Sequence, residues 1–170
     1  MKITNREAAI FAVLGAIMYA TKVAMELIPN VHLLGVFVVT FTVKYRAKAL
    51  FPIYLYVFAN GFSEGFDVFG WLPETYLWLV LWGIVMLLPK KMPKNVAPIV
   101  YMIVAGFHGL AFGTLYAPVY ALSTGLGWDR IWMWILAGLP FDIIHAVSNF
   151  ILGSLIVPLV TLLGKLDKKT

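Results

Sequence analysis

Apolar residues run almost without interruption through six stretches of the chain, and basic residues mark the boundary of every second stretch. The stretches cover about residues 7–28, 33–46, 49–62, 76–88, 96–117 and 140–163. One helical span of a bilayer needs roughly 20 apolar residues. The pattern therefore predicts an all-α integral membrane protein with six transmembrane helices in a single membrane domain over residues 1–170.

The basic residues predict how these helices are oriented. Eleven of the thirteen Lys and Arg residues form four clusters: Lys2 and Arg6; Lys44, Arg46 and Lys48; Lys90, Lys91 and Lys94; Lys165, Lys168 and Lys169. The 37 to 70 residues between neighbouring clusters are enough for two spans each. Because loops rich in Lys and Arg stay cytoplasmic, we expect both termini inside and three loops outside. The first stretch is expected to be an uncleaved helix, since no A-x-A-like site closes it.

Composition narrows the function classes. Hydrophobic residues make up 62% of the chain and charged residues only 12%, compared with about 25% charged in soluble domains. The positive charge is therefore assigned to topology and lipid headgroups and not to nucleic acid. No Walker-type nucleotide motif is present, so ATP-driven work would need a partner protein. The catalytic patterns G-x-S-x-G and H-E-x-x-H are also missing, and we do not expect an enzyme.

The last apolar region is too long for a single span. As one helix, residues 130–163 would measure about 50 Å, against a hydrocarbon core of about 30 Å. Proline fits the first turn of a helix and disturbs its interior. The sequence therefore predicts a short outer helix over 129–139, and a last transmembrane helix that begins at Pro140. A single kinked helix is the alternative, and the choice decides how deep Asp142 lies.

Small residues recur on two helices. The first helix carries alanine at every fourth position: Ala8, Ala12, Ala16, Ala20 and Ala24. Small side chains let two helix backbones approach closely in lipid, so this ladder is either internal packing or a docking face for another membrane protein. Gly109 and Gly113 form a shorter pair that we assign to internal packing.

Polar residues inside apolar helices are the candidates for a functional site. Asp142, His145 and Asn149 share one face of the last helix, either as a ligand site or as a polar network that reaches His108. Metal ligation by His108, His145 and Asp142 is a weaker alternative. Lys22 and Glu26, one turn apart, are expected to form an ion pair near the outer interface, or else to contact a ligand.

Two tryptophans complete the candidate site. Trp78 and Trp82 lie one turn apart on the fourth helix, and Trp82 is too deep for an interfacial aromatic belt. An indole at that depth either packs in the core or stacks on a ring-shaped ligand. The expected ligand-binding set is Trp78, Trp82, His108, Asp142, His145 and Asn149, with no catalytic residue, metal ligand or cofactor.

This layout resembles the substrate-binding S components of energy-coupling factor (ECF) vitamin transporters. The residues that carry the resemblance are the alanine ladder, the turn at 27–30 and the segment 138–145. The resemblance implies that Ala12, Ala16 and Ala20 dock on a transmembrane coupling subunit driven by two ABC-type ATPases. It also implies a vitamin site in the outer half, with Asp142 and His145 as ligand contacts. Some members have lysine in place of His145, so the resemblance does not predict which ligand this chain binds.

The sequence and the resemblance together predict a high-affinity binding subunit of an ATP-driven importer in a prokaryotic cytoplasmic membrane. Its ligand would be a small water-soluble vitamin or a related heterocyclic micronutrient. The alternative is a self-sufficient carrier or channel in which Lys22, Glu26, Asp142 and His145 form an ion or proton path. Internal repeats would support a carrier, and none is clear in this chain.

Overall fold

The computed structural model describes residues 2–169 and is all-helical, which confirms the predicted fold class at that level. Its helices are α1 (Asn5–Met25), α2 (Leu34–Tyr45), α3 (Leu50–Glu64), α4 (Trp71–Leu87), α5 (Ala97–Thr124), α6 (Trp128–Leu152) and α7 (Ile156–Lys169). Short 3-10 turns, Arg46–Ala49 and Gly153–Leu155, precede α3 and α7. Of the last predicted basic cluster only Lys165 is described in full, because the side chains of Lys168 and Lys169 lie outside the described part.

Three segments of the described chain are long and apolar enough to cross a membrane: Asn5–Met25, Ala97–Thr124 and Trp128–Asp167. Helix α4 is apolar but shorter, with 17 residues. Many large apolar side chains point outward, among them Phe107, Val147 and Ile151. An exposed apolar surface of this kind belongs in lipid. These features indicate that the chain associates with a membrane, while the six-span topology stays a prediction.

Helix α2 is the centre of the molecule. All nine residues from Leu34 to Thr42 are buried, and the helix packs against α1, α4, α5 and α7. Its 12 residues extend only about 18 Å at 1.5 Å per residue. A helix enclosed by other helices does not have to match the bilayer thickness, because its ends face protein. This enclosure accounts for the short second apolar stretch.

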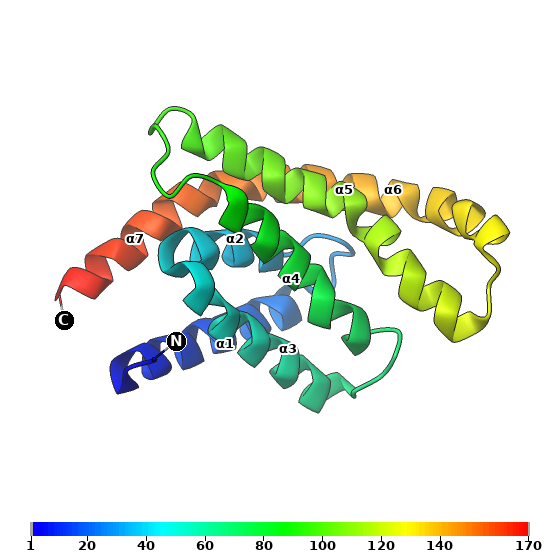
Figure 1. The fold of residues 1–170 in the computed structure, drawn as a ribbon, viewed down its shortest axis with the longest axis horizontal. Coiled ribbons are helices and arrows are strands. Elements are labelled where there is room, and N and C mark those ends of the chain that lie inside the picture. Colours follow the sequence, from blue (N-terminus) through cyan, green and yellow to red (C-terminus); the bar gives the residue numbers. More distant parts are fainter. Residues whose placement is uncertain (1, 170) are drawn as a thin grey trace.

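Helices α5 and α6 form a long antiparallel hairpin whose far halves extend beyond the other helices (Figure 1). Three glycines of α5 make the close crossing possible. A Cβ atom at Gly106 would lie 3.2 Å from the carbonyl oxygen of Ala146, and one at Gly109 would lie 2.8 Å from that of His145. Gly113 lies against the carboxylate of Asp142. The assignment of Gly109 and Gly113 to internal packing is therefore confirmed.

The predicted break at Pro140 is wrong. Helix α6 runs through Pro140 without interruption, and the predicted start of the last helix at 140 is replaced by a start at Trp128. The interruption lies instead at Gly153–Leu155, just before Pro158. Pro158 occupies the first turn of α7, where its missing N–H is not needed. Pro140 lies inside α6. A proline inside a helix leaves one backbone carbonyl without its usual N–H partner, and membrane helices tolerate this because neighbouring groups can pair with that carbonyl.

Two other helix ends differ clearly from the predicted ones. Helix α5, expected to end at 117, passes through Pro118 and ends at Thr124, where Gly125 takes a left-handed conformation with φ of 68°. Helix α4 begins at Trp71 and not at 76. The Asp67 carboxylate closes the turn before α4 by accepting bonds of 2.7 and 2.6 Å from the N–H groups of residues 69 and 70. These N–H groups hold the pKa of Asp67 below its ordinary value.

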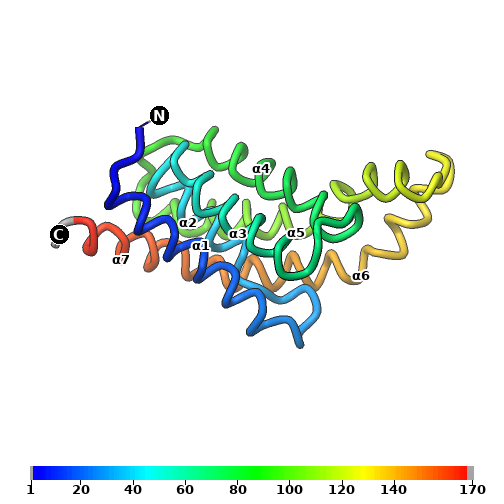
Figure 2. Tube along the Cα trace, turned by 90° about the horizontal axis from the view of Figure 1, so that it is seen from below, coloured from blue at the N-terminus to red at the C-terminus, as the bar shows by residue number. Residues whose placement is uncertain are grey.

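The basic clusters gather at one end of the molecule. Lys44 pairs with Asp167 at 2.6 Å, and Lys48 pairs with Glu7 at 2.5 Å. The Arg46 guanidinium donates a 2.6 Å bond to a backbone carbonyl in the last turn of α4, just before the third cluster. Both termini lie at this end in both views (Figures 1 and 2). The prediction that all basic clusters lie on the same side of the membrane requires them to share one end of the molecule. That this end faces the cytoplasm stays a prediction.

Candidate ligand-binding site

The three histidines of the chain meet in one cluster of rings, which we call the histidine cluster: His32, Trp78, His108, Phe112 and His145. The ring centroids of His32 and His145 are 4.7 Å apart, and those of His145 and Phe112 are 4.8 Å apart. Trp78 lies 5.7 Å from His108 and 6.1 Å from His32. The rings come from the α1–α2 loop and from three helices, α4, α5 and α6.

Bonds to helix backbones hold two sides of the histidine cluster. The His108 Nε2–H group donates to the carbonyl oxygen of Leu77 at 3.0 Å, which ties α5 to α4 beside Trp78. Asn149 Nδ2 donates to the carbonyl oxygen of Ala105 at 3.4 Å and ties α6 to α5. Trp78, His108 and Asn149 are each at most 1% exposed. Their orientation is therefore fixed before any ligand arrives.

The third side of the histidine cluster is the loop that carries His32. The hydroxyl of Ser148 on α6 lies 3.0 Å from the carbonyl oxygens of Asn30 and of His145, so its one proton is shared between the loop and α6. Asn30 has a φ of 60°. Gly35, at the start of α2, lets the chain approach α6, since a Cβ atom there would lie 3.2 Å from Asn149 Nδ2. One hydroxyl bond to a loop carbonyl is a weak fastening. This loop is accordingly the part of the site that can move most easily.

The histidine cluster and Asn149 hold five buried side-chain atoms that have no hydrogen-bond partner in the described part of the chain. They are His32 Nδ1, Trp78 Nε1, His108 Nδ1, His145 Nε2 and Asn149 Oδ1. A buried polar group without a partner typically costs about 1 to 3 kcal/mol. Buried polar groups are nearly always paired, so five unpaired ones in one cluster point to partners supplied by a bound molecule.

The unpaired atoms offer hydrogen bonds without a net charge. The indole N–H of Trp78 is a donor; His108 Nδ1 is an acceptor because Nε2 already carries the donated proton, and Asn149 Oδ1 is an acceptor as well. Burial lowers the pKa of His32 in the α1–α2 loop to about 4, so this imidazole is neutral at pH 7. Within residues 2–169, no group of three or more His, Cys, Asp or Glu side chains could hold a metal ion.

Two of the predicted site residues bond to backbone groups and make no ring contact with the histidine cluster among the described residues. Asp142 accepts a 3.0 Å bond from the backbone N–H of Gly113, so it joins α6 to α5 and does not reach His108 as expected. Trp82 donates to the carbonyl oxygen of Arg46 at 3.3 Å, toward the end of the molecule that carries the basic clusters. Of the predicted ligand-binding set, Trp78, His108 and His145 belong to the histidine cluster. Asn149 and Asp142 border it on α6, bonded to Ala105 and to Gly113, whereas Trp82 lies toward the basic end.

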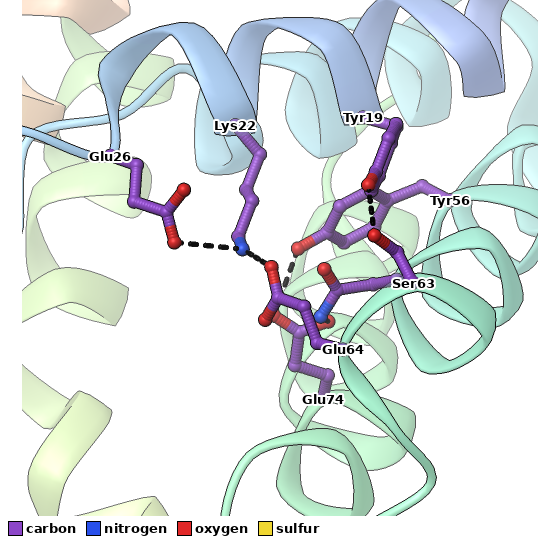
Figure 3. A network of polar contacts seen from close by, with 8 residues as sticks. Tyr19, Lys22, Glu26, Tyr56, Ser63, Glu64 and Glu74 are labelled. Atoms are coloured by element: carbon purple, nitrogen blue, oxygen red, sulfur yellow. Dashed lines mark hydrogen bonds and ion pairs between the residues drawn. The ribbon is translucent and has the colours of Figure 1, made fainter.

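A second polar network joins the other ends of α1, α3 and α4 (Figure 3). The Lys22 ammonium pairs with Glu64 on α3 and, at 3.6 Å, with Glu26 on its own helix, so the expected Lys22–Glu26 ion pair is present. On the α4 side, the Tyr56 hydroxyl donates to Glu74 at 2.8 Å. Lys22 thus joins α1 to α3 through Glu64, while His145 packs in the histidine cluster among other helices.

The alanine ladder faces outward. Ala8, Ala12, Ala16, Ala20 and Ala24 are all exposed, so the reading of the ladder as internal packing does not hold. The close contact of α1 with α3 uses Gly15 instead, where a Cβ atom would lie 2.8 Å from Leu55 Cβ and 3.1 Å from the carbonyl oxygen of Pro52. The ladder therefore leaves a smooth strip on the outer surface of α1, next to this crossing.

Sequence reasoning missed two members of the histidine cluster. His32 lies just before the second predicted helix, outside the predicted site, and Phe112 has no distinguishing feature among the twelve phenylalanines of the chain. For His32 a signal did exist, because the chain has only three histidines and the other two were already candidates. Phe112 lies one turn after His108 on α5 and contacts its ring. Its membership of the cluster follows only from its contact with His145 on α6, which the sequence does not reveal.

Comparisons with known proteins do not assign the chain to a family. No protein family matches the chain, and neither a curated protein nor a solved structure is significantly similar to it.

Proposed function

We propose that the protein is a membrane-embedded binding protein for a small, uncharged, planar molecule, acting as the substrate-binding S component of an ECF-type importer. The observation that carries the binding proposal is the set of five unpaired buried polar atoms in the histidine cluster and at Asn149. A heterocycle with both donor and acceptor atoms matches the indole N–H, the amide oxygen and the imidazole nitrogens. The flat faces of Trp78 and Phe112 suit an aromatic ring.

Ligand entry requires a movement, because the rings of the histidine cluster are in contact with one another. The α1–α2 loop is the natural moving part. It carries His32, and the described residues hold it to α6 by the shared Ser148 hydroxyl and the His32–His145 ring contact. We infer that the loop lifts to admit the ligand and returns so that His32 closes over it. Such closure removes water and strengthens every hydrogen bond in the site.

The importer role rests on the resemblance and on the exposed alanine strip of α1. A small-residue strip exposed on a lipid-facing helix permits close approach of a helix from another protein. The described residues carry no nucleotide-binding motif, so energy for uptake would come from ATPase partners. The carrier alternative is less well supported, because Lys22 pairs with Glu26 and Glu64 where α1 meets α3, while His145 belongs to the histidine cluster.

The decisive experiment is native mass spectrometry of the protein purified in mild detergent, followed by identification of any small molecule that is released on unfolding. We expect one heterocycle per chain, and its loss from the His145→Ala variant. Lys91→Ala, an exposed change at the basic end, is the matched control and should keep the molecule. A wild-type protein with no bound molecule, whose melting temperature no vitamin-like heterocycle raises, would contradict the proposal.

A further inference from the structure

Tyr56 packs against Trp78 from α3, a helix that contributes no ring to the histidine cluster. The centroids of the two rings are 6.5 Å apart and their planes meet at 72°, which is an edge-to-face contact. Ring pairs in this arrangement are favourable beyond the apolar area that they bury. Both side chains are buried in the core. Tyr56 therefore forms part of the wall against which the indole of the candidate site is packed.

The hydroxyl of Tyr56 is anchored to α4. It donates a 2.8 Å hydrogen bond to Glu74 Oε1 (Figure 3). Glu74 precedes Trp78 by four residues, so the two side chains share one face of α4. Glu74 is also held from a second direction, because Asn60 Nδ2 donates to its Oε2 at 3.4 Å. The phenol is thus fixed by a carboxylate one helical turn away from the indole that its ring contacts.

Trp78 has no such anchor of its own. Its indole N–H is buried and makes no hydrogen bond with the described residues, so packing orients the indole. Two of the rings around it, His108 and Phe112, stand 5.7 and 6.1 Å away on α5. A third, His32, belongs to the loop that we infer lifts to admit a ligand. The Tyr56 ring lies outside that loop and is fixed at its hydroxyl, so it can hold the indole while the loop is open.

Two other side-chain bonds hold α3 against α4. The Tyr54 hydroxyl donates to the carbonyl oxygen of Thr75 at 2.7 Å, and the Trp71 indole donates to the carbonyl oxygen of Val57 at 2.9 Å. Tyr54 makes no ring contact with Trp78 among the described residues. These two bonds would keep the helices together if the bond between the buried phenol and the carboxylate were lost. That bond therefore contributes something other than helix attachment.

We propose that Tyr56 and Glu74 are positioning residues of the candidate site. The carboxylate fixes the phenol, and the phenol ring holds the Trp78 indole in the orientation that presents its unpaired N–H. The inference rests on the proposed function for the role of Trp78 as a ligand contact, whereas the fixed orientation is a property of the ligand-free protein. A site that is ordered in advance loses less conformational freedom when it binds.

The test is fluorine NMR of protein that is washed free of small molecules and carries fluorotryptophan at its six tryptophan positions. The Trp78→Phe variant identifies the resonance of Trp78. In Tyr56→Phe this resonance should broaden or split, because the ring is no longer anchored and the indole takes more than one orientation. Tyr54→Phe is the matched control. It removes a hydroxyl bond of similar length between the same two helices, and should leave the resonance single and sharp.

Glu74 provides a second pair of variants. Glu74→Ala removes the acceptor and should reproduce the spectrum of Tyr56→Phe. Glu74→Gln keeps an oxygen for the Tyr56 hydroxyl, and the amide of Asn60 can turn its unpaired Oδ1 toward the new N–H group, so the single resonance should persist. The small molecule identified in the wild-type protein should bind about 2- to 10-fold more weakly to Tyr56→Phe and Glu74→Ala, the equivalent of one ordinary hydrogen bond.

Two results would overturn the positioning role. A single sharp Trp78 resonance in Tyr56→Phe or Glu74→Ala, whichever folds, would show that the indole does not depend on this anchor. Equal broadening in Tyr54→Phe would show that the spacing of the two helices orients the indole. Failure of the proposed function would be seen separately, as a wild-type protein that binds no small molecule. The Trp78 resonance is recorded without a ligand and decides the positioning role in that case as well.

Discussion

Gly109 of α5 lies against the backbone of His145 of α6, so closely that a Cβ atom at position 109 would stand 2.8 Å from the carbonyl oxygen of His145. This contact places an imidazole of the histidine cluster at a helix crossing that tolerates no side chain. The packing of the hairpin and the geometry of the candidate site are therefore linked through one glycine.

The first prediction concerns this contact. Gly109→Ala should lower the free energy of unfolding by about 1 to 3 kcal/mol, because the added methyl group forces α5 and α6 apart. Gly83→Ala is the control, since a Cβ atom at position 83 meets nothing within 4 Å and alanine favours helix. Thermal unfolding in detergent measures both. Equal melting temperatures of the two variants would contradict the close crossing.

The second prediction separates binding from folding at Trp78. Trp78→Phe removes an indole N–H that has no partner among the described residues, but it also leaves a small cavity in the core, so the melting temperature of the ligand-free protein should fall modestly. Affinity for the co-purified ligand should fall about 5- to 150-fold, the range for a buried hydrogen bond left unmade. Titration calorimetry provides the dissociation constant. An unchanged dissociation constant would remove Trp78 from the site.

The third prediction is a dependence on pH. Burial lowers the pKa of His32 from 6.5 to about 4. The unfolded chain therefore binds more protons than the folded chain below about pH 6.5, and the free energy of unfolding falls as the pH is lowered from 6.5 toward 4. Above that range the contribution of His32 is constant.

Melting temperatures between pH 4 and pH 8 test this dependence. His32→Phe keeps a ring in contact with His145 and Trp78 but cannot take up a proton. Its melting temperature should decline less at acidic pH than that of the wild type. If the two curves run parallel, His32 does not contribute to the pH dependence.

The fourth prediction concerns the alanine strip. Ala16→Trp should prevent assembly with a coupling subunit and leave the protein folded, because Ala16 is exposed and the added indole points outward. Val147→Trp on α6 is a control of similar bulk at another exposed position. Co-purification with a co-expressed coupling module is the measurement. Normal assembly of the Ala16 variant would exclude this face as the docking surface.

The fifth prediction concerns topology. The chain has no cysteine, so single cysteines can be introduced at will. Val68→Cys in the α3–α4 loop should react with an impermeant reagent in sealed cells, and Lys91→Cys in the α4–α5 loop should react only after lysis; both positions are exposed. The reason is that basic loops remain cytoplasmic. Labelling of position 91 from outside would show that the predicted six-span arrangement is inverted or wrong.

Helices and their approximate order were predictable because long apolar stretches have few alternatives in a membrane, where every backbone group must be paired internally. The position at which the last helix is interrupted was not predictable in this way. Pro140 and Pro158 have the same local chemistry, yet one lies inside α6 and the other in the first turn of α7. Which proline ends up at a helix start depends on how α6 packs on α5, and a local rule cannot decide that.

The sequence indicates which individual residues are candidates for the site, but it does not show which of them lie together. Helical spacing places His145 and Asn149 on one face, and the structure packs both against α5: His145 touches Phe112, and Asn149 bonds to the Ala105 carbonyl. The same reasoning included Trp82, one turn from Trp78, which lies toward the opposite end and contacts Arg46. Sequence spacing says which side chains share a helix face, but not which neighbouring helix covers each turn of it.

The sequence by itself determined that the chain is a helical membrane protein with its positive charge at one end, because hydrophobicity and charge act on each segment separately. Only the tertiary structure decided that the alanine ladder stays exposed while Gly15 takes the close contact, and that His32 joins two distant histidines. Those outcomes depend on how helices far apart in the chain rotate and pack, and packing is a property of pairs of surfaces rather than of either segment alone.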